Sequence, residues 1–226
     1  MKFVNIEGLD GSGKSTQIKL LKKYFEENNI KYKYMHFPRT DSPIYGELIA
    51  KFLRGELGKM ESVDPYLIAL IYAGDRNDAK SQINEWLKQD YLVLIDRYVY
   101  SNIAFQCAKL NDSKEIEKLS DWVKYLEYEH FKIPRPDIEI FLDVPSEFTK
   151  QNLSKTREGS DRDYLQGKQD IHEKNITFQE RVREIYLTEV EKEDNFYKIE
   201  CYNENEKIHE PEVIKQKILD SIKIKI

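Results

Sequence analysis

Residues 8–15 constrain the fold of this chain more than any other segment. They read Gly-Leu-Asp-Gly-Ser-Gly-Lys-Ser, a complete Gly-x-x-x-x-Gly-Lys-Ser phosphate loop, and they directly follow the apolar, strand-like residues 3–6. A helical pattern follows the loop and ends near Asn28 and Asn29. Glycines let such a loop turn around an anion, so that consecutive backbone N–H groups converge on a phosphate. The sequence therefore predicts a strand, a loop and a helix that together bind a nucleoside triphosphate.

Two side chains of this loop have chemistry that suits a magnesium-bound triphosphate. Lys14 is expected to bridge the β- and γ-phosphates, and Ser15 to place its hydroxyl on Mg²⁺. The helix that begins here would direct the positive end of its dipole at the phosphates.

Composition excludes several classes of protein. With 36 basic and 41 acidic residues the net charge is −5, which disfavours binding to a polynucleotide. No apolar run is long enough to span a bilayer, and Cys107 and Cys201 form no Cys-x-x-Cys pair. Strand-like residues begin almost at Met1, which leaves no room for a leader, so we expect a cytoplasmic protein without a membrane anchor. The histidines show no metal-ligand spacing.

Strand-like and helical patterns alternate along the rest of the chain. This alternation predicts an α/β protein, a three-layer P-loop NTPase fold whose five-stranded parallel sheet is flanked by helices, in a single domain over residues 1–226. Further strands are predicted at 33–37, 91–95, 138–142 and 196–199, and helices at 44–53, 66–87, 101–108, 115–131, 146–153, 171–193 and 211–222.

Charged residues follow two of the predicted strands. Asp96 and Arg97 come directly after strand 91–95, and Arg39 follows strand 33–37 after Pro38. Ligands of open parallel sheets bind at the carboxyl ends of the strands. Asp96 can hold a Mg²⁺ water there, and Arg97 can grip an acceptor phosphate with paired N–H donors. The alternative for Asp96 and Arg97 is a structural salt bridge at the end of a strand. Arg39 would meet a second phosphorylated ligand, and the alternative there is a simple turn with an exposed arginine.

Two further segments suggest base binding and a lid. Tyr72 and Arg76 lie four residues apart in helix 66–87, so Tyr72 can stack on a nucleobase while Arg76 donates to its carbonyl. The alternative is a half-buried core tyrosine. Residues 155–163 are dense in charge, and a mobile lid over about 154–168 could bring Arg157 or Arg162 to the transferring phosphoryl group. A solvated loop is the alternative.

Taken together, these motifs resemble the thymidylate kinase family, the nucleoside monophosphate kinases that make thymidine diphosphate from thymidine monophosphate and ATP. The resemblance spans most of the chain. It rests on the loop Gly8 to Thr16, on Phe37-Pro38-Arg39, on Asp75-Arg76, on Asp96-Arg97-Tyr98 with Ser101-Asn102, and on the lid from Arg157 to Arg162.

The resemblance implies a role for each matching residue. Asp10 would lie near the sugar and the phosphoryl-transfer path, Arg39 and Arg97 would hold the acceptor phosphate, and Phe105 would press against the deoxyribose. Tyr72 would stack on thymine, while Arg76 and Asn102 would hydrogen-bond it. The catalytic residues would be Asp10, Lys14, Arg97, Arg157 and Arg162. ATP would be bound by Gly8, Gly11, Ser12, Gly13, Lys14, Ser15 and Thr16, and Mg²⁺ by Ser15 and Asp96. The acceptor would be bound by Asp10, Phe37, Arg39, Tyr72, Arg76, Arg97, Ser101, Asn102 and Phe105.

The family pattern also implies ATP and Mg²⁺ as requirements, direct in-line transfer without a covalent enzyme intermediate, a homodimer and a lid that supplies the catalytic cation. This chain departs from it at Tyr72, where many members have Phe, and at Phe105, where some have Tyr. Residues 170–173 read Asp-Ile-His-Glu where the pattern often has Tyr before the Glu, so the resemblance gives His172 no role.

Three other functions stay open from the sequence. A deoxynucleoside kinase would need no arginine for an acceptor phosphate, and Arg39 argues against it. Kinases of other monophosphates are a second alternative; Phe105 should oppose the 2′-hydroxyl of uridylate. A non-catalytic nucleotide-binding switch would need no second site, and a guanine-specific one would carry an Asn-Lys-x-Asp base reader, which the sequence lacks.

Overall fold

A computed structural model describes residues 2–153, 165–166, 170–172 and 176–223. Its centre is a five-stranded sheet in the order β2-β3-β1-β4-β5, in which every neighbouring pair is parallel, as the sequence predicts. The strands are β1 (Phe3–Gly8), β2 (Tyr32–His36), β3 (Leu92–Asp96), β4 (Ile138–Asp143) and β5 (Phe196–Glu200). The helices are α1 (Lys14–Glu27), α2 (Tyr45–Leu53), the short 3₁₀ turn Met60–Ser62, α3 (Pro65–Lys88), α4 (Val99–Cys107), α5 (Ser113–Lys124), the π-helical turn Tyr125–His130, α6 (Ser146–Leu153), α7 (Ile176–Lys192) and α8 (Pro211–Lys223).

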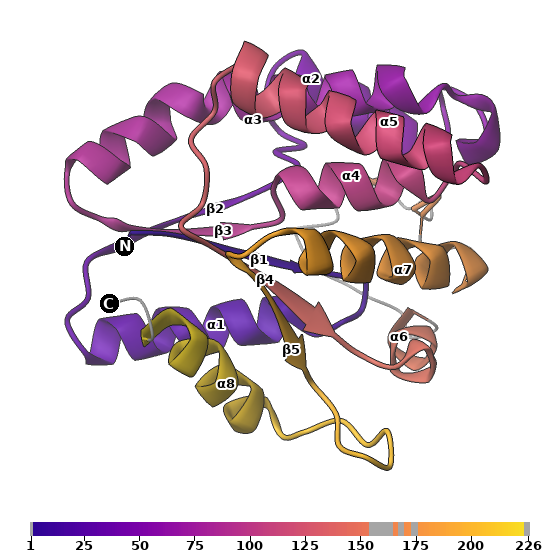
Figure 1. Cartoon of the computed structure of the whole chain (residues 1–226). Coiled ribbons are helices and arrows are strands. Elements are labelled where there is room, and N and C mark those ends of the chain that lie inside the picture. The colour runs from indigo at the N-terminus through magenta and orange to yellow at the C-terminus, as the bar shows by residue number, and fades with distance from the viewer. Residues whose placement is uncertain (1, 154–164, 167–169, 173–175, 224–226) are drawn as a thin grey trace.

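Helices cover both faces of the sheet. Figure 1 shows α1 and α8 on one face, and α3, α4, α5 and α7 on the other. The residues of β1 and β4 are buried throughout because both strands are central and covered on both sides, whereas those of the edge strand β2 are only half-buried.

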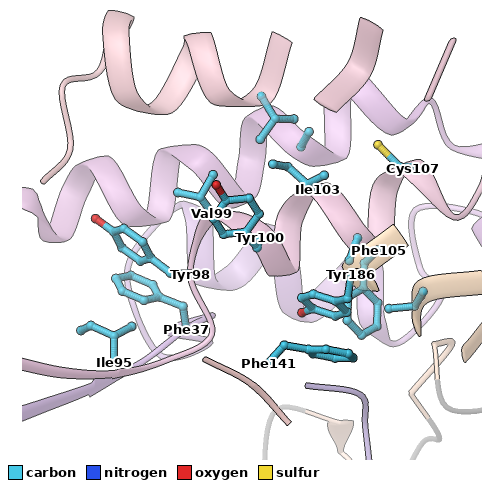
Figure 2. Close-up of a cluster of buried hydrophobic side chains, with 14 of the residues drawn as sticks. Phe37, Ile95, Tyr98, Val99, Tyr100, Ile103, Phe105, Cys107, Phe141 and Tyr186 are labelled. Atoms are coloured by element: carbon cyan, nitrogen blue, oxygen red, sulfur yellow. The ribbon is translucent and has the colours of Figure 1, made fainter. Parts of the chain in front are cut away.

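The larger of the two main hydrophobic clusters lies under α3, α4 and α7. Figure 2 shows aromatic rings from separate elements in it, among them Phe37, Tyr98, Phe141 and Tyr186. Phe141 and Tyr186 stack with ring centroids 4.6 Å apart, and Phe37 and Tyr98 lie 5.8 Å apart. This packing fixes α4 and α7 relative to the carboxyl ends of the strands.

Two predicted helices differ from the structure. The helix predicted at 115–131 is interrupted after α5 by the π-helical turn, in which the Phe131 N–H bonds the Leu126 carbonyl five residues back at 2.9 Å. The helix predicted from residue 171 does not include Ile171 and His172, and the structure describes it, as α7, from Ile176 onward. Ile171 donates its N–H to the Leu53 carbonyl and His172 to the Asp170 side chain, so both form turn contacts in place of helical ones.

Helices long and apolar enough to cross a membrane are absent from the part of the chain that the structure describes. Arg157, Arg162 and nearly all of the segment predicted to be a lid lie outside the described residues.

Candidate active site

The phosphate loop joins β1 to α1, as predicted. Gly11 (φ 77°) and Gly13 (φ 86°) adopt the left-handed backbone conformation that glycine tolerates best, and Gly13 caps the N-terminus of α1. Ser15 and Thr16 are exposed in the first turn of α1. The Ser12 hydroxyl, by contrast, is buried without a hydrogen-bond partner within the described residues. The loop therefore presents a helix N-terminus and free hydroxyls to the sheet edge.

Lys14 is held inside the curve of the loop. Its ammonium donates to the Gly8 carbonyl at 3.1 Å and to the Leu9 carbonyl at 2.9 Å. Burial, with the nearby Arg97 charge, lowers the pKa of Lys14 to about 8. Neutral carbonyls compensate the ammonium only in part, so an anion in the loop would stabilise its charge.

Asp96 ends β3 beside the loop, because its strand pairs with β1 in the register Ile6↔Asp96. One carboxylate oxygen lies 3.2 Å from His36 Nδ1, and the other is buried without a hydrogen-bond partner in the described chain. Burial acts to raise the pKa of Asp96, but His36 and Lys14 together lower it to about 2. Asp96 is thus ionised and keeps one oxygen available.

Arg97 and Asp10 form an ion pair at the centre of the site. Arg97 Nη2 donates to Asp10 Oδ1 at 2.6 Å, and its Nη1 donates to Ser101 Oγ at 3.2 Å. Gln179 on α7 donates to the other oxygen of Asp10 at 3.0 Å. Burial acts to raise the pKa of Asp10, but Arg97 and Lys14 hold it below its ordinary value. The guanidinium also lies over the Phe105 ring, 5.1 Å from its centroid.

Glu7, at the end of β1, is a site residue that the sequence reasoning missed. Arg97 has a left-handed backbone (φ 67°), uncommon for a residue with a side chain. Fully buried, Glu7 accepts the N–H of Tyr98 at 2.7 Å and of Ser101 at 3.2 Å, as well as the Tyr186 hydroxyl at 2.9 Å. Glu7 therefore fixes the turn that carries Arg97. In the sequence, the only sign of this role is that a charged residue, Glu7, directly follows the strand-like residues 3–6.

Arg39 is fixed by α3 rather than left as an exposed turn residue. Its Nε donates to Asp75 Oδ1 at 2.9 Å, its Nη2 to the Asp75 carbonyl at 2.8 Å, and Asp75 also accepts the Arg39 N–H at 2.8 Å. Phe37, predicted to contact the acceptor, is buried against Tyr98, and the Arg39 guanidinium lies 5.9 Å from its ring centroid.

Tyr72 and Phe105 border the space between α3, α4 and α7. Tyr72 is half-buried, and burial, with Asp170 and Asp10 nearby, raises the pKa of its hydroxyl. The Phe105 ring packs against His172 with centroids 5.0 Å apart and against Phe178 at 6.1 Å.

His172 is a neighbour of the site to which the sequence gave no role. Burial, with Lys109 close by, lowers the pKa of His172 to about 3, so the imidazole is neutral. Its Nε2 is buried without a hydrogen-bond partner among the described residues.

Arg76 and Asn102, from α3 and α4, meet at one carboxylate. Glu127, in the π-helical turn, accepts from Arg76 Nε at 2.5 Å, from Arg76 Nη2 at 2.7 Å and from Asn102 Nδ2 at 3.0 Å. All three side chains are at least nine-tenths buried. Glu127 was also missed, because a glutamate in a helical pattern is normally taken as a solvated side chain.

The structure therefore brings most of the predicted residues to one edge. Gln179 and Asn152, which the sequence did not single out, support it: Asn152 on α6 donates to the Gly11 carbonyl at 2.8 Å. The result is a phosphate loop whose Asp10 pairs with Arg97, whose guanidinium lies over the Phe105 ring, with a second arginine, Arg39, held by Asp75. Such a site can hold a triphosphate and a second, phosphorylated ligand in contact with each other.

Comparison with known proteins points to one family. A family model described as thymidylate kinase matches residues 6–211. The thymidylate kinase of Plasmodium falciparum is 32% identical over 208 residues, which cover 92% of this chain and 86% of that protein. A probable thymidylate kinase of Pyrobaculum aerophilum is 34% identical over 85% of both chains. The solved structure of thymidylate kinase from Candida albicans shares the fold, with a TM-score of 0.71 at 22% identity over 99% of this chain and 91% of that one.

Proposed function

The chain belongs to the thymidylate kinase family, and on that premise we propose that it transfers the γ-phosphoryl group of ATP to thymidine monophosphate (dTMP), forming thymidine diphosphate (dTDP) and ADP. The observation that carries this proposal beyond family membership is the Arg97–Asp10 pair, which places a guanidinium against the phosphate loop and over the Phe105 ring. A protein that only bound nucleotide would not need this second set of charged groups.

The phosphate loop binds the donor. Backbone N–H groups from Gly11 to Ser15 hold the β-phosphate, and Lys14 leaves the Gly8 and Leu9 carbonyls to bridge the β- and γ-phosphates. ATP also restores full protonation of Lys14, because phosphate charges favour the ammonium form.

Mg²⁺ fits the donors at this edge. The exposed Ser15 hydroxyl and the unpartnered buried oxygen of Asp96 are the hard oxygen ligands that Mg²⁺ prefers, Asp96 acting through a water. Ser15 and Asp96 would hold the ion together with phosphate oxygens of the donor. When bound, Mg²⁺ neutralises charge on the β- and γ-phosphates.

Arginines bind the acceptor phosphate and aim its oxygen at the γ-phosphorus. Arg97 turns its paired N–H donors from Asp10 and Ser101 toward that phosphate, and Arg39 contacts it from the other side. Transfer is direct and in line, so catalysis consists of positioning and charge stabilisation. Arg157 and Arg162, which lie outside the described residues, supply further cations.

The pocket between α3, α4 and α7 binds the nucleoside. Thymine stacks on Tyr72 and hydrogen-bonds Arg76 and Asn102, while Phe105 lies against the deoxyribose where a 2′-hydroxyl would clash. Asp10 contacts the sugar near the transfer path.

A homodimer is the proposed assembly. Leu67 and Leu70 lie one turn apart on α3 with 60% and 42% of their surfaces exposed. A second copy that packs its own α3 against them would bury this apolar strip.

An acceptor panel tests the function. ATP consumption with Mg²⁺ is measured in parallel with dTMP, deoxyuridine monophosphate, uridine monophosphate and thymidine. We expect the highest kcat/KM with dTMP, since the thymine methyl contributes about 1–3 kcal/mol of discrimination. Turnover of thymidine alone would indicate a nucleoside kinase, and tight ATP binding without turnover of any acceptor would indicate a binding module.

A further inference from the structure

Glu127 connects the two side chains proposed to read the base, yet phosphoryl transfer itself does not require it. It is fully buried and joins α3 to α4 by accepting from Arg76 and Asn102. Its carboxylate is thus a shared hydrogen-bond acceptor of both side chains.

The contacts of Asn102 determine which way its amide points. Asn102 Nδ2 donates to Glu127 Oε1 and to the Ala69 carbonyl, both at 3.0 Å. Both partners only accept hydrogen bonds, so the nitrogen must face them and Oδ1 must face away. Asn102 Oδ1 is buried and has no hydrogen-bond partner in the described parts of the chain. A buried acceptor left in this state is costly until a ligand supplies a donor.

The π-helical turn Tyr125–His130 explains how Glu127 reaches this position. The turn inserts an extra residue after α5, and its Glu127 carbonyl accepts the Ile133 N–H at 3.1 Å. Such turns occur frequently at functional sites. Two residues later Glu129 points outward, 61% exposed, and pairs with Arg135 at 2.8 Å. The same turn thus contains one inward and one outward glutamate.

The fixed groups match one class of base. Thymine presents a ring N–H between two carbonyl oxygens, so its N–H can donate to Asn102 Oδ1 while Arg76 donates to a carbonyl. Cytosine presents a ring nitrogen lone pair and an amino group, which would face Oδ1 and the guanidinium with the wrong polarity. We infer that Glu127 is a positioning residue that orients Asn102 and Arg76 and thereby sets the preference for a base with a ring N–H over cytosine. This inference rests on the proposed function.

Glu127→Gln tests this role, with Glu129→Gln as the matched control. The glutamine keeps one acceptor oxygen and puts an amide donor in place of the other, so Arg76 loses its paired charged contact and Asn102 is no longer held by a carboxylate. We expect the dTMP KM to rise at least about tenfold, since charge-assisted hydrogen bonds are lost, while the ATP KM stays within about twofold. The ratio of kcat/KM for dTMP over deoxycytidine monophosphate (dCMP) should fall by a similar factor. Glu129→Gln should match the wild type in all of these.

Glu127→Asp provides a variant that keeps the charge opposite Arg76, so the buried guanidinium stays compensated. Its shorter side chain withdraws from Asn102, and we expect a raised dTMP KM in a protein that folds. The inference is overturned if both Glu127 variants keep the wild-type dTMP KM and base preference. It is also overturned if kcat falls equally for all acceptors at unchanged KM, because that result would indicate a purely structural role.

Calorimetric titration of dTMP and dCMP without ATP separates this inference from the proposed function. Wild-type protein that binds dTMP but does not phosphorylate it would refute the function, and weaker dTMP binding by Glu127→Gln would still support the role of Glu127. Equal dTMP affinity of the wild type and this variant would refute that role.

Discussion

At the scale of single residues, the two arginines proposed to bind the acceptor phosphate are each paired with a carboxylate. Arg97 pairs with Asp10 at 2.6 Å and Arg39 with Asp75 at 2.8 Å. In the proposed function, these carboxylates keep both guanidinium groups at the carboxyl edge of the sheet, from which Arg97 turns toward the acceptor phosphate. The phosphate must compete with Asp10 for Arg97, but Asp10 keeps its hydrogen bond from Gln179 when Arg97 turns away.

Arg97→Ala tests the role of this guanidinium. We expect kcat with dTMP to fall by at least about 100-fold, as when one preorganised donor to a developing charge is removed. Thermal unfolding should show a folded protein. Arg135→Ala is the control, because Arg135 is exposed and pairs only with Glu129 among the ion pairs described. Near-normal rates for Arg97→Ala in a steady-state coupled assay would exclude the assigned role.

His172→Phe tests the buried imidazole through pH. His172 has a folded pKa of about 3 and an unfolded pKa of about 6.5, so below pH 6.5 the unfolded state binds more protons and the fold loses stability as pH falls. For this one group the loss between pH 7.5 and 5.5 is about 1.4 kcal/mol. Phenylalanine preserves the ring contacts with Phe105 and Phe178. Urea unfolding at both pH values should show a smaller pH dependence for the variant by about that amount; equal dependence would mean that His172 is protonated in the folded state.

At the scale of elements, the packing of α2 on α3 holds the loop that carries Arg39. The ring of Tyr45, at the start of α2, lies against Gly74 of α3, where a Cβ would come within 2.1 Å of Tyr45 Cε1. A Cβ at Gly46 would lie 2.3 Å from the Arg39 carbonyl. Glycine is therefore needed at both positions for the helices and this loop to approach so closely.

Gly74→Ala should reverse the usual effect of this substitution in a helix. Where a helical glycine has free space around it, replacement by alanine raises the free energy of unfolding by about 0.5–1 kcal/mol. Here the added methyl displaces Tyr45, and we expect a loss of about 1–3 kcal/mol in the free energy of unfolding. Tyr45→Ala combined with Gly74→Ala should cost less than the sum of the single variants, measured in urea. Additive costs would show that the two residues do not meet.

Sequence patterns predicted the elements that local residues specify. Periodicity and the phosphate loop predict the strand before Gly8 and the helix after Lys14. The alternation of strand and helix patterns predicts that the strands of the sheet are parallel. The residues that orient the site were not predictable in the same way. Glu7 and Glu127 are indistinguishable from solvated glutamates until β1, α3 and α4 are assembled around them, because their partners are distant in the sequence. Glu127 lies 25 residues from Asn102 and 51 from Arg76, and Glu7 lies 91 residues from Tyr98.

At the scale of the whole molecule, the two faces of the sheet are covered by different hydrophobic clusters. Helices α1 and α8 pack on one face against a largely aliphatic cluster of side chains, while the face under α3, α4 and α7 carries the cluster with most of the aromatic rings (Figures 1 and 2). In the proposed function the ligands meet at the carboxyl edge of the sheet, and the exposed Leu67 and Leu70 of α3 form the proposed contact with a second copy.

Leu67→Glu tests the proposed homodimer. We expect the wild type to sediment at about twice the chain mass of 26.9 kDa, and the variant to dissociate because a charge would be buried in the interface. Val213→Glu on α8, where the side chain is 44% exposed, should leave the assembly unchanged. A wild type that sediments as a monomer at all concentrations would contradict the proposal.

Direct observation of the products tests whether this protein transfers a phosphoryl group from a nucleoside triphosphate to a nucleoside monophosphate. Phosphorus NMR of the wild-type protein with ATP, Mg²⁺ and dTMP follows each phosphate separately. We expect ADP and dTDP to form in equal amounts as ATP and dTMP disappear. Release of inorganic phosphate without dTDP, or no reaction, would contradict the account.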